Sequence, residues 1–195
     1  MKKTQHLRKK RIQKGLIVMG IILIIISLFI IIFRTISGES YRQVVKDEDN
    51  PIPRPDFDVM LLTPNEYSRP GLKIGKINAI VIHYTANPGS SAKNNRDYFE
   101  GLKNSHITKA SSHFIVGLKG EVVQCIPTSE YSYASNSRNK DTISIETCYK
   151  NDDGSYEKAT YKSMVNLTAW LLVKFGLDTD DIIRHYDITG KICPK

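Results

Sequence analysis

Most of this sequence has no excess of basic over acidic residues, although its formal net charge is +8. Residues 1–15 hold seven Lys and Arg and no acid, and Arg34 adds an eighth basic residue. The remaining 20 of the 28 Lys and Arg match the 20 Asp and Glu of the whole chain. A neutral body offers no basic surface for nucleic acid, so we exclude nucleic acid as a partner.

Compact metal-binding motifs are also absent. The five histidines and three cysteines form neither an HExxH motif nor a CxxC pair. There is no internal repeat, and no low-complexity tract outside residues 16–33. With 41% hydrophobic and 25% charged residues, the 195-residue chain has the composition of a folded protein and room for one domain with a core.

An uncharged apolar run follows the basic residues and extends over residues 16–33. At about 1.5 Å per residue, a helix of this length would span roughly 27 Å, close to the thickness of the membrane's hydrocarbon core. A cleaved signal peptide is the alternative, but no A-x-A-like site follows the run. We therefore predict a transmembrane anchor, with residues 1–15 as a cytoplasmic tail and residues 34–195 outside the cell.

Residues 34–57 have few large apolar side chains and three spaced prolines, which favour an extended extracytoplasmic linker. The folded domain is expected over residues 58–195. Strands are predicted over residues 77–85, 112–117, 121–126, 142–148 and 181–187. Helices are predicted over 90–103 and 161–175, with Thr160 capping the second and Gly176 ending it. This mixture predicts an α/β (α+β mixed) fold with a central mixed sheet flanked by helices.

Two histidines lie where strands are predicted to end, and a cysteine follows the second. His83 ends the first predicted strand, His185 ends the last, and Cys193 comes eight residues later. Two imidazoles and one thiolate can hold zinc while its fourth position stays open for water. The alternative is two hydrogen-bonded histidines and a buried free cysteine, and the spacing alone leaves both open.

Two charged residues fit a hydrolytic metal site. Lys191 lies two residues before Cys193, so in an extended chain both side chains point the same way, and Lys191 could stabilise an oxyanion. Glu146 lies on the polar face of an otherwise apolar strand and could act as a general base beside zinc. A solvated lysine and a solvated glutamate are the alternatives.

From about Leu62 onward the sequence resembles the zinc-dependent N-acetylmuramoyl-L-alanine amidases, a family that also includes phage amidase-type lysozymes and peptidoglycan recognition proteins. The matching stretches are NEYSRPG (65–71), IVIHYTA (80–86), SSHFIVGLKGEVVQCIP (111–127), TISIE (142–146) and RHYDITGKICP (184–194). The resemblance implies the fold of that family and one zinc ion on His83, His185 and Cys193.

The same resemblance implies further roles. Lys191 would stabilise the oxyanion and Glu146 would be the general base, while His113, Tyr84 and Asn136 would contact the substrate. Two positions depart from the family pattern. Ser112 stands where some phage members have a catalytic tyrosine, so Glu146 would act as the base alone. Tyr133 stands where relatives often have a histidine, which puts substrate contacts in doubt.

The implied function is hydrolysis of the amide bond between N-acetylmuramic acid and L-alanine in peptidoglycan. The enzyme would be anchored in the cell membrane of a Gram-positive bacterium, with its catalytic domain outside. The alternative is a membrane-tethered module that binds peptidoglycan without catalysis.

Two questions stay open: whether two of the cysteines form a disulfide, and how the domain ends after Cys193. Cys125 and Cys148 could pair in an oxidising compartment or be separate buried side chains. The chain stops at Lys195, two residues after Cys193. Relatives continue beyond this point, so we expect either a truncated domain or a ligand loop close to a terminus.

Overall fold

The computed structural model describes residues 19, 22, 25–29 and 44–195. The chain divides into two units, residues 1–41 and 42–195, and the described part of the second unit carries the features below. The described residues of the first unit are helical and exposed.

The predicted location as a single-pass protein of the cell membrane is wrong. Among the residues that the structure describes, no helix is long and apolar enough to cross a membrane. Of the predicted anchor, residues 16–18, 20–21, 23–24 and 30–33 lie outside the described residues, as do the predicted tail 1–15 and linker residues 34–43.

A six-stranded sheet forms the centre of the second unit, in the order β1-β4-β3-β5-β2-β6. Its strands are β1 (Asp58–Val59), β2 (Ala79–Tyr84), β3 (Phe114–Val116), β4 (Val122–Gln124), β5 (Thr142–Thr147) and β6 (Ile182–Arg184). β3 and β4 pair antiparallel across the predicted hairpin, and the other neighbouring pairs are parallel. The sheet is therefore mixed, as predicted.

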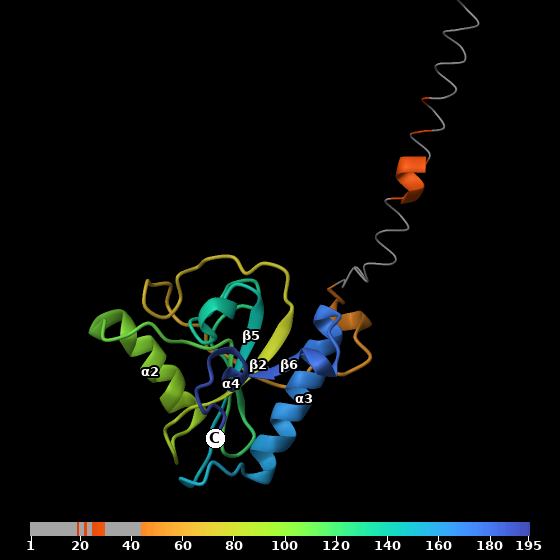
Figure 1. The fold of residues 1–195 in the computed structure, drawn as a ribbon. Coiled ribbons are helices and arrows are strands. Elements are labelled where there is room, and N and C mark those ends of the chain that lie inside the picture. The colour runs from red at the N-terminus through yellow and green to blue at the C-terminus, as the bar shows by residue number, and fades with distance from the viewer. Residues whose placement is uncertain (1–18, 20–21, 23–24, 30–43) are drawn as a thin grey trace, which may run out of the picture. The chain divides into compact units, whose positions relative to one another are not determined.

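Helices cover both faces of this sheet. α2 (Ala92–Ser105) lies on one side and α3 (Lys158–Phe175) on the other, and the short α4 (His185–Thr189) follows β6 (Figure 1). Three 3-10 turns complete the elements: η1 (Asp47–Asp49), η2 (Asn136–Arg138) and η3 (Thr179–Asp181). The predicted arrangement of a mixed sheet flanked by helices is confirmed.

Alternation along the strands divides the core into two apolar clusters. On β2 and β5, Ile80, Ile82, Ile143 and Ile145 point toward α3 and pack with its Trp170. Residues of the opposite face, among them Ile115 of β3, pack with α2. Burial of these side chains stabilises the fold by about 25 cal/mol per Å² of apolar surface.

Two elements begin or end differently from the prediction. α3 begins at Lys158, and Thr160 lies inside it, where its buried Oγ1 donates to the Gly117 carbonyl at 2.9 Å instead of capping the helix. β6 stops at Arg184, and His185 begins α4 instead of continuing a strand. The Asp187 carboxylate accepts from the Arg184 backbone N–H at 2.8 Å, and this cap turns the chain into a helix.

The compact unit also begins before the predicted boundary at residue 58. The Val45 backbone N–H donates to the Lys174 carbonyl at 2.8 Å, and Asn50 Nδ2 donates to the Trp170 carbonyl at 3.1 Å. Ile52 and Phe57 pack against the core cluster on the α3 side. These contacts fix residues 45–57, which were predicted as part of an extended linker, to α3.

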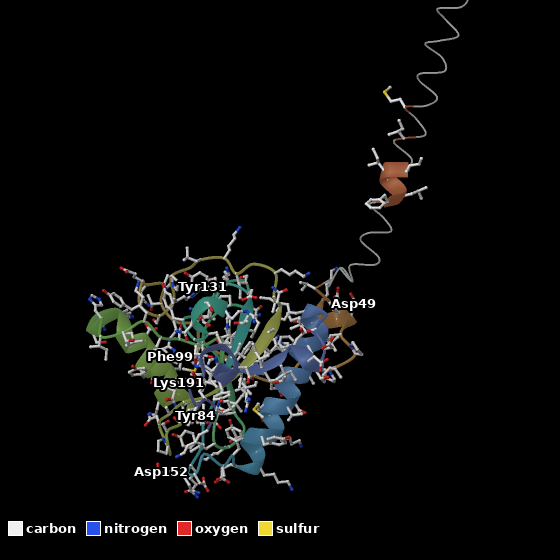
Figure 2. The ribbon with its side chains drawn as sticks, viewed as in Figure 1. Asp49, Tyr84, Phe99, Tyr131, Asp152 and Lys191 are labelled. Carbon is white, nitrogen blue, oxygen red and sulfur yellow. The ribbon has the colours of Figure 1, made fainter. Side chains whose placement is uncertain are left out.

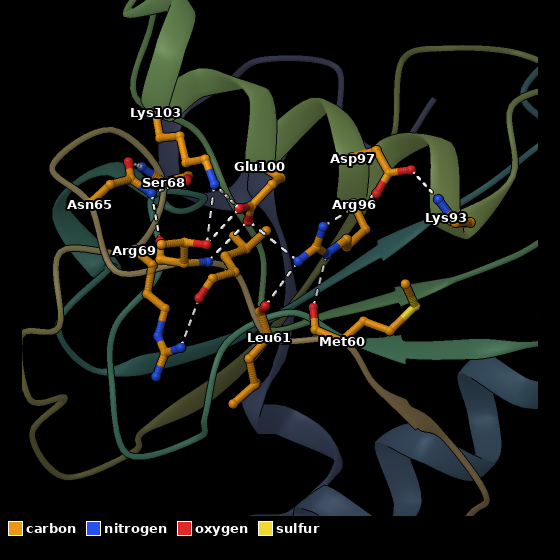
Figure 3. A network of polar contacts seen from close by, with 12 residues as sticks. Met60, Leu61, Asn65, Ser68, Arg69, Lys93, Arg96, Asp97, Glu100 and Lys103 are labelled. Atoms are coloured by element: carbon orange, nitrogen blue, oxygen red, sulfur yellow. Dashed lines mark hydrogen bonds and ion pairs between the residues drawn. The ribbon is translucent and has the colours of Figure 1, made fainter.

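A polar network fastens α2 to the segment that precedes β2 (Figure 3). Arg96 donates to the carbonyls of Met60 and Leu61 at 3.0 and 2.9 Å. Glu100 accepts from the Thr63 backbone N–H at 3.0 Å and from the Thr63 hydroxyl at 2.7 Å. Because both side chains are mostly buried, these bonds hold α2 in place beside the cleft described next.

Candidate metal centre and cleft

Three neighbouring parallel strands, β5, β2 and β6, end side by side and position the residues of the candidate site. In the register of β2 and β5, His83 lies opposite Glu146. β6 pairs with β2 up to Ile82 opposite Arg184, so His185 follows directly at the same edge. The carboxyl ends of neighbouring parallel strands are where open α/β sheets present functional groups. The sheet therefore places all three side chains at one edge.

The structure brings together the three side chains that the sequence suggested as ligands. One ligand atom each of His83, His185 and Cys193 lies within 4.8 Å of the others. His83 Nδ1 is 3.7 Å from Cys193 Sγ, and the two imidazole centroids are 4.8 Å apart. All three residues are buried. These residues form a candidate metal site.

Burial keeps this cluster uncharged when no cation is present. Desolvation, with the nearby His185 and Lys191, lowers the pKa of His83 to about 3. Desolvation and Lys191 also lower the pKa of His185. For Cys193, desolvation raises the pKa of the thiol to about 11, against a backbone hydrogen bond from Tyr84 that lowers it. Two neutral imidazoles and a thiol that needs a neighbouring cation to ionise suit a divalent metal.

The segment that carries Cys193 is tied to the domain on both sides. The Tyr186 backbone N–H donates to the Cys193 carbonyl at 2.9 Å. The Lys195 ammonium donates to the Asp152 carbonyl. The Cys193–Pro194 peptide is cis. Cys193 is therefore held in place although it lies two residues from Lys195.

Glu146 lines the same cleft as the candidate metal site and has one carboxylate oxygen without a partner among the described residues. Its Oε2 is buried and has no hydrogen-bond partner within the described part of the chain. Burial raises the pKa of Glu146 to about 8, and Lys191 opposes this shift. Lys191 itself is exposed. A carboxylate that has a raised pKa and an oxygen without a hydrogen-bond partner, and that lies beside a candidate metal site, can both accept and return a proton.

A cleft of about 430 Å³ opens over the cluster. Figure 2 labels Phe99, Lys191 and Tyr84, which line it from α2, the C-terminal segment and β2. Its other lining residues are His83, Thr85, Ala86, Asn95, Tyr98, Lys109, Ala110, Ser111, Tyr133, Ala134, Asn136, Asn139, Glu146, His185 and Cys193. The candidate ligands, Glu146 and Lys191 therefore share one cleft.

The predicted substrate contacts are in different places. Tyr84 and Asn136 line the cleft, and Asn136 Oδ1 lies 2.9 Å from His185 Nε2. His113 has 0% exposed surface and is not among the residues that line the cleft. Its ring contacts Ser144 Oγ at 3.0 Å and the Glu130 carbonyl at 2.8 Å. Buried hydrogen bonds therefore occupy both nitrogens of its ring, and substrate contact by His113 stays a prediction.

The two departures from the family pattern lie in different surroundings, one buried and one in the cleft. Ser112 is fully buried and donates to the Phe114 carbonyl at 2.8 Å, so it does not take the place of a catalytic tyrosine. Tyr133 lines the cleft and lies 5.7 Å from the Lys109 ammonium, measured from its ring centroid. Lys109 and Ser135 were not predicted as site residues, because isolated polar residues in loops give no periodic signal.

The remaining cysteines and the tryptophan serve packing. Cys125 and Cys148 are both free and buried in the apolar cluster on the α2 side. The structure therefore has no disulfide between them. Trp170 is 2% exposed within the other cluster, where Phe57 packs beside it.

The chain belongs to the N-acetylmuramoyl-L-alanine amidase family, whose profile matches residues 73–195. Among curated relatives, it is 41% identical over 143 residues to the N-acetylmuramoyl-L-alanine amidase CwlL of Bacillus licheniformis. It is 38% identical over 151 residues to the N-acetylmuramoyl-L-alanine amidase BlyA of Bacillus subtilis (strain 168). The two matches cover 67% of this chain, but only 39% of CwlL and 40% of BlyA.

Solved structures show the same fold. The catalytic domain of XlyA superposes with a TM-score of 0.62 at 23% identity, covering 72% of this chain and 90% of that domain. PlyL superposes with a TM-score of 0.61 at 22% identity, covering 72% of this chain and 87% of PlyL. At these identities the likeness concerns the fold, and it supports the predicted family architecture.

Proposed function

We propose that this domain hydrolyses the amide bond between N-acetylmuramic acid and L-alanine in peptidoglycan, and that it needs one zinc ion per chain. The observation that carries the proposal is the convergence of His83, His185 and Cys193 within 4.8 Å in a cleft that also holds Glu146. The names of the relatives support the reaction.

The donor set suits zinc. One thiolate and two neutral imidazoles are ligands that zinc accepts in four-coordinate sites, and three protein ligands leave one position open. Hard cations such as magnesium and calcium prefer oxygen ligands, which the cluster does not offer. Zinc held there supplies a Lewis acid for the amide carbonyl and lowers the pKa of water.

Glu146 acts as the general base and then as the general acid. Its unpartnered Oε2 takes a proton from the attacking water and later delivers it to the leaving nitrogen of L-alanine. The raised pKa of about 8 shows that the surroundings favour the protonated carboxyl, and a cation nearby offsets this preference. Breaking the amide bond then leaves a free carboxyl on the lactyl group and a free amine on the peptide.

Lys191 stabilises the charge that develops on the carbonyl oxygen. It lines the same cleft, and its charge lowers the pKa values of both histidines and of Cys193. A cation so close to a candidate metal site is unfavourable unless an anion forms between them, which an oxyanion does. Tyr84, which lines the cleft beside Cys193, contacts the substrate.

Digestion of purified peptidoglycan tests the proposal. We expect the protein to release new L-alanine amino termini, and a chelator to stop the release until zinc is returned. Cys193→Ser is the matched control, because it changes one candidate ligand by a single atom. Release that is unaffected by the chelator would refute the zinc requirement, and cleavage at other bonds would refute the proposed reaction.

A further inference from the structure

One short loop lies behind both candidate histidine ligands. Ser135 Oγ is 3.3 Å from His83 Nε2, and Asn136 Oδ1 is 2.9 Å from His185 Nε2. Adjacent residues of one loop thus contact the same nitrogen of two rings that come from different elements, β2 and α4.

These contacts determine which nitrogen each ring offers. A neutral imidazole carries its proton on one nitrogen and a lone pair on the other. Because Asn136 Oδ1 can only accept, His185 Nε2 donates to it and Nδ1 keeps the lone pair. His83 Nδ1 faces Cys193 Sγ at 3.7 Å, which leaves Nε2 for Ser135. Because a serine hydroxyl can accept as well as donate, His83 Nε2 can donate to Ser135 Oγ, and both rings can then hold the same tautomer.

The loop is fixed by its own hydrogen bonds. Asn139 Oδ1 accepts from the backbone N–H groups of Ala134 and Ser135 at 3.1 and 2.6 Å. The Arg138 N–H donates to the Ser135 carbonyl at 2.9 Å, and Ser135 is 1% exposed. Asn136 has φ +51°, a left-handed conformation that asparagine adopts more readily than most residues. The two acceptors are thus held in position by the protein alone.

We propose that Ser135 and Asn136 are positioning residues that hold both imidazoles with Nδ1 toward the metal and thereby set the affinity for zinc. This inference rests on the metal site of the proposed function. It replaces the sequence-based expectation that Asn136 contacts substrate. A hydrogen bond behind a ligating histidine fixes its tautomer and orientation, and its loss weakens metal binding about 10- to 100-fold.

Zinc affinity, measured by competition with a chromophoric chelator, tests the inference without using activity. We expect Ser135→Ala and Asn136→Gly each to weaken zinc binding about 10- to 100-fold. Glycine is chosen at position 136 because it removes the acceptor while tolerating the positive φ. Asn136→Asp keeps an acceptor and should retain wild-type affinity. Ser137→Ala, at an exposed position in the same loop, is the matched control.

A spectroscopic readout separates positioning from a general loss of structure. In the zinc-loaded protein, the Nε2 protons of both histidines should exchange slowly with water, as seen by NMR of the ring nitrogens. Ser135→Ala should speed exchange at His83 alone, and Asn136→Gly at His185 alone. A general loosening of the loop would instead affect both rings equally.

The outcomes distinguish this inference from the proposed function. A wild-type protein that binds no zinc refutes the proposed function. A wild type that binds zinc, with variants of unchanged affinity and unchanged proton exchange, refutes only the inference. If Asn136→Gly and Asn136→Asp both raise the KM for peptidoglycan while zinc affinity stays the same, Asn136 contacts the substrate and the inference is wrong.

Discussion

The buried histidines that lie in or next to strands of the sheet fall into two groups, which differ in how their ring nitrogens are used. At His113, Nδ1 lies 3.0 Å from Ser144 Oγ and Nε2 lies 2.8 Å from the Glu130 carbonyl, so the protein occupies both nitrogens. His83 and His185 each have Nε2 against a loop residue, and His83 Nδ1 lies 3.7 Å from Sγ of the third candidate ligand, Cys193.

Burial alone does not separate the two groups. Desolvation lowers the pKa of His83 to about 3 and that of His113 to about 4. The two groups differ in two respects. Only the candidate ligands His83 and His185 keep an unused nitrogen lone pair, and only they line the cleft. A buried histidine with one free nitrogen beside a thiol can bind a metal, whereas one with two protein partners contributes to stability.

The largest expected effect comes from removing a ligand. His83→Ala or Cys193→Ser should abolish both zinc binding and hydrolysis, since two remaining ligands hold the metal poorly. Elemental analysis and release of L-alanine amino termini measure the two effects. His113→Ala should keep one zinc per chain, and loss of zinc in that variant would break the distinction between the two groups.

Replacing the proposed base should separate catalysis from metal binding. Glu146→Gln keeps the size of the side chain but removes its ability to take a proton, so hydrolysis should fall about 10²-fold or more. Zinc content should stay at one per chain. A variant with wild-type activity would show that Glu146 is not the base.

His113 should matter for stability. His113→Ala removes the acceptor of the buried Ser144 backbone N–H and the partner of the Glu130 carbonyl, which should cost about 1–3 kcal/mol of unfolding free energy per unsatisfied group. Chemical denaturation of the zinc-loaded variant measures the loss. If stability is unchanged and the KM for peptidoglycan rises instead, His113 acts on substrate after all.

The smallest expected effect is a pH dependence of stability in the metal-free protein. Because the pKa of His113 is lowered to about 4, the unfolded chain binds more protons than the folded one below about pH 6.5. Stability from this residue is complete above pH 6.5 and is lost as the pH falls toward 4. His113→Gln should remove a slope of up to about 1.4 kcal/mol per pH unit, measured by denaturation across this range.

Much of the fold could be predicted because local sequence patterns indicate its main strands and helices. The predicted strands over residues 77–85 and 142–148 contain β2 and β5, and the predicted helix over 90–103 corresponds to α2, which Ser91 caps. Parallel pairing of these strands then brings His83 beside Glu146, which no local pattern states.

The features that could not be predicted from the sequence depend on tertiary contacts. Residues 45–57 look extended in isolation but bind to α3 through single hydrogen bonds and two apolar side chains. His113 looks like a groove residue by resemblance, yet partners distant in sequence enclose it. The contacts of Ser135 and Asn136 with the two histidines likewise join residues about 50 positions apart in the sequence.

The zinc content of the purified protein tests the central claim most directly, when compared between the wild type and Cys193→Ser after dialysis against a weak chelator. The account predicts one zinc per wild-type chain and none in the variant, with both proteins folded. A wild type without zinc, or equal zinc in the two proteins, would contradict it.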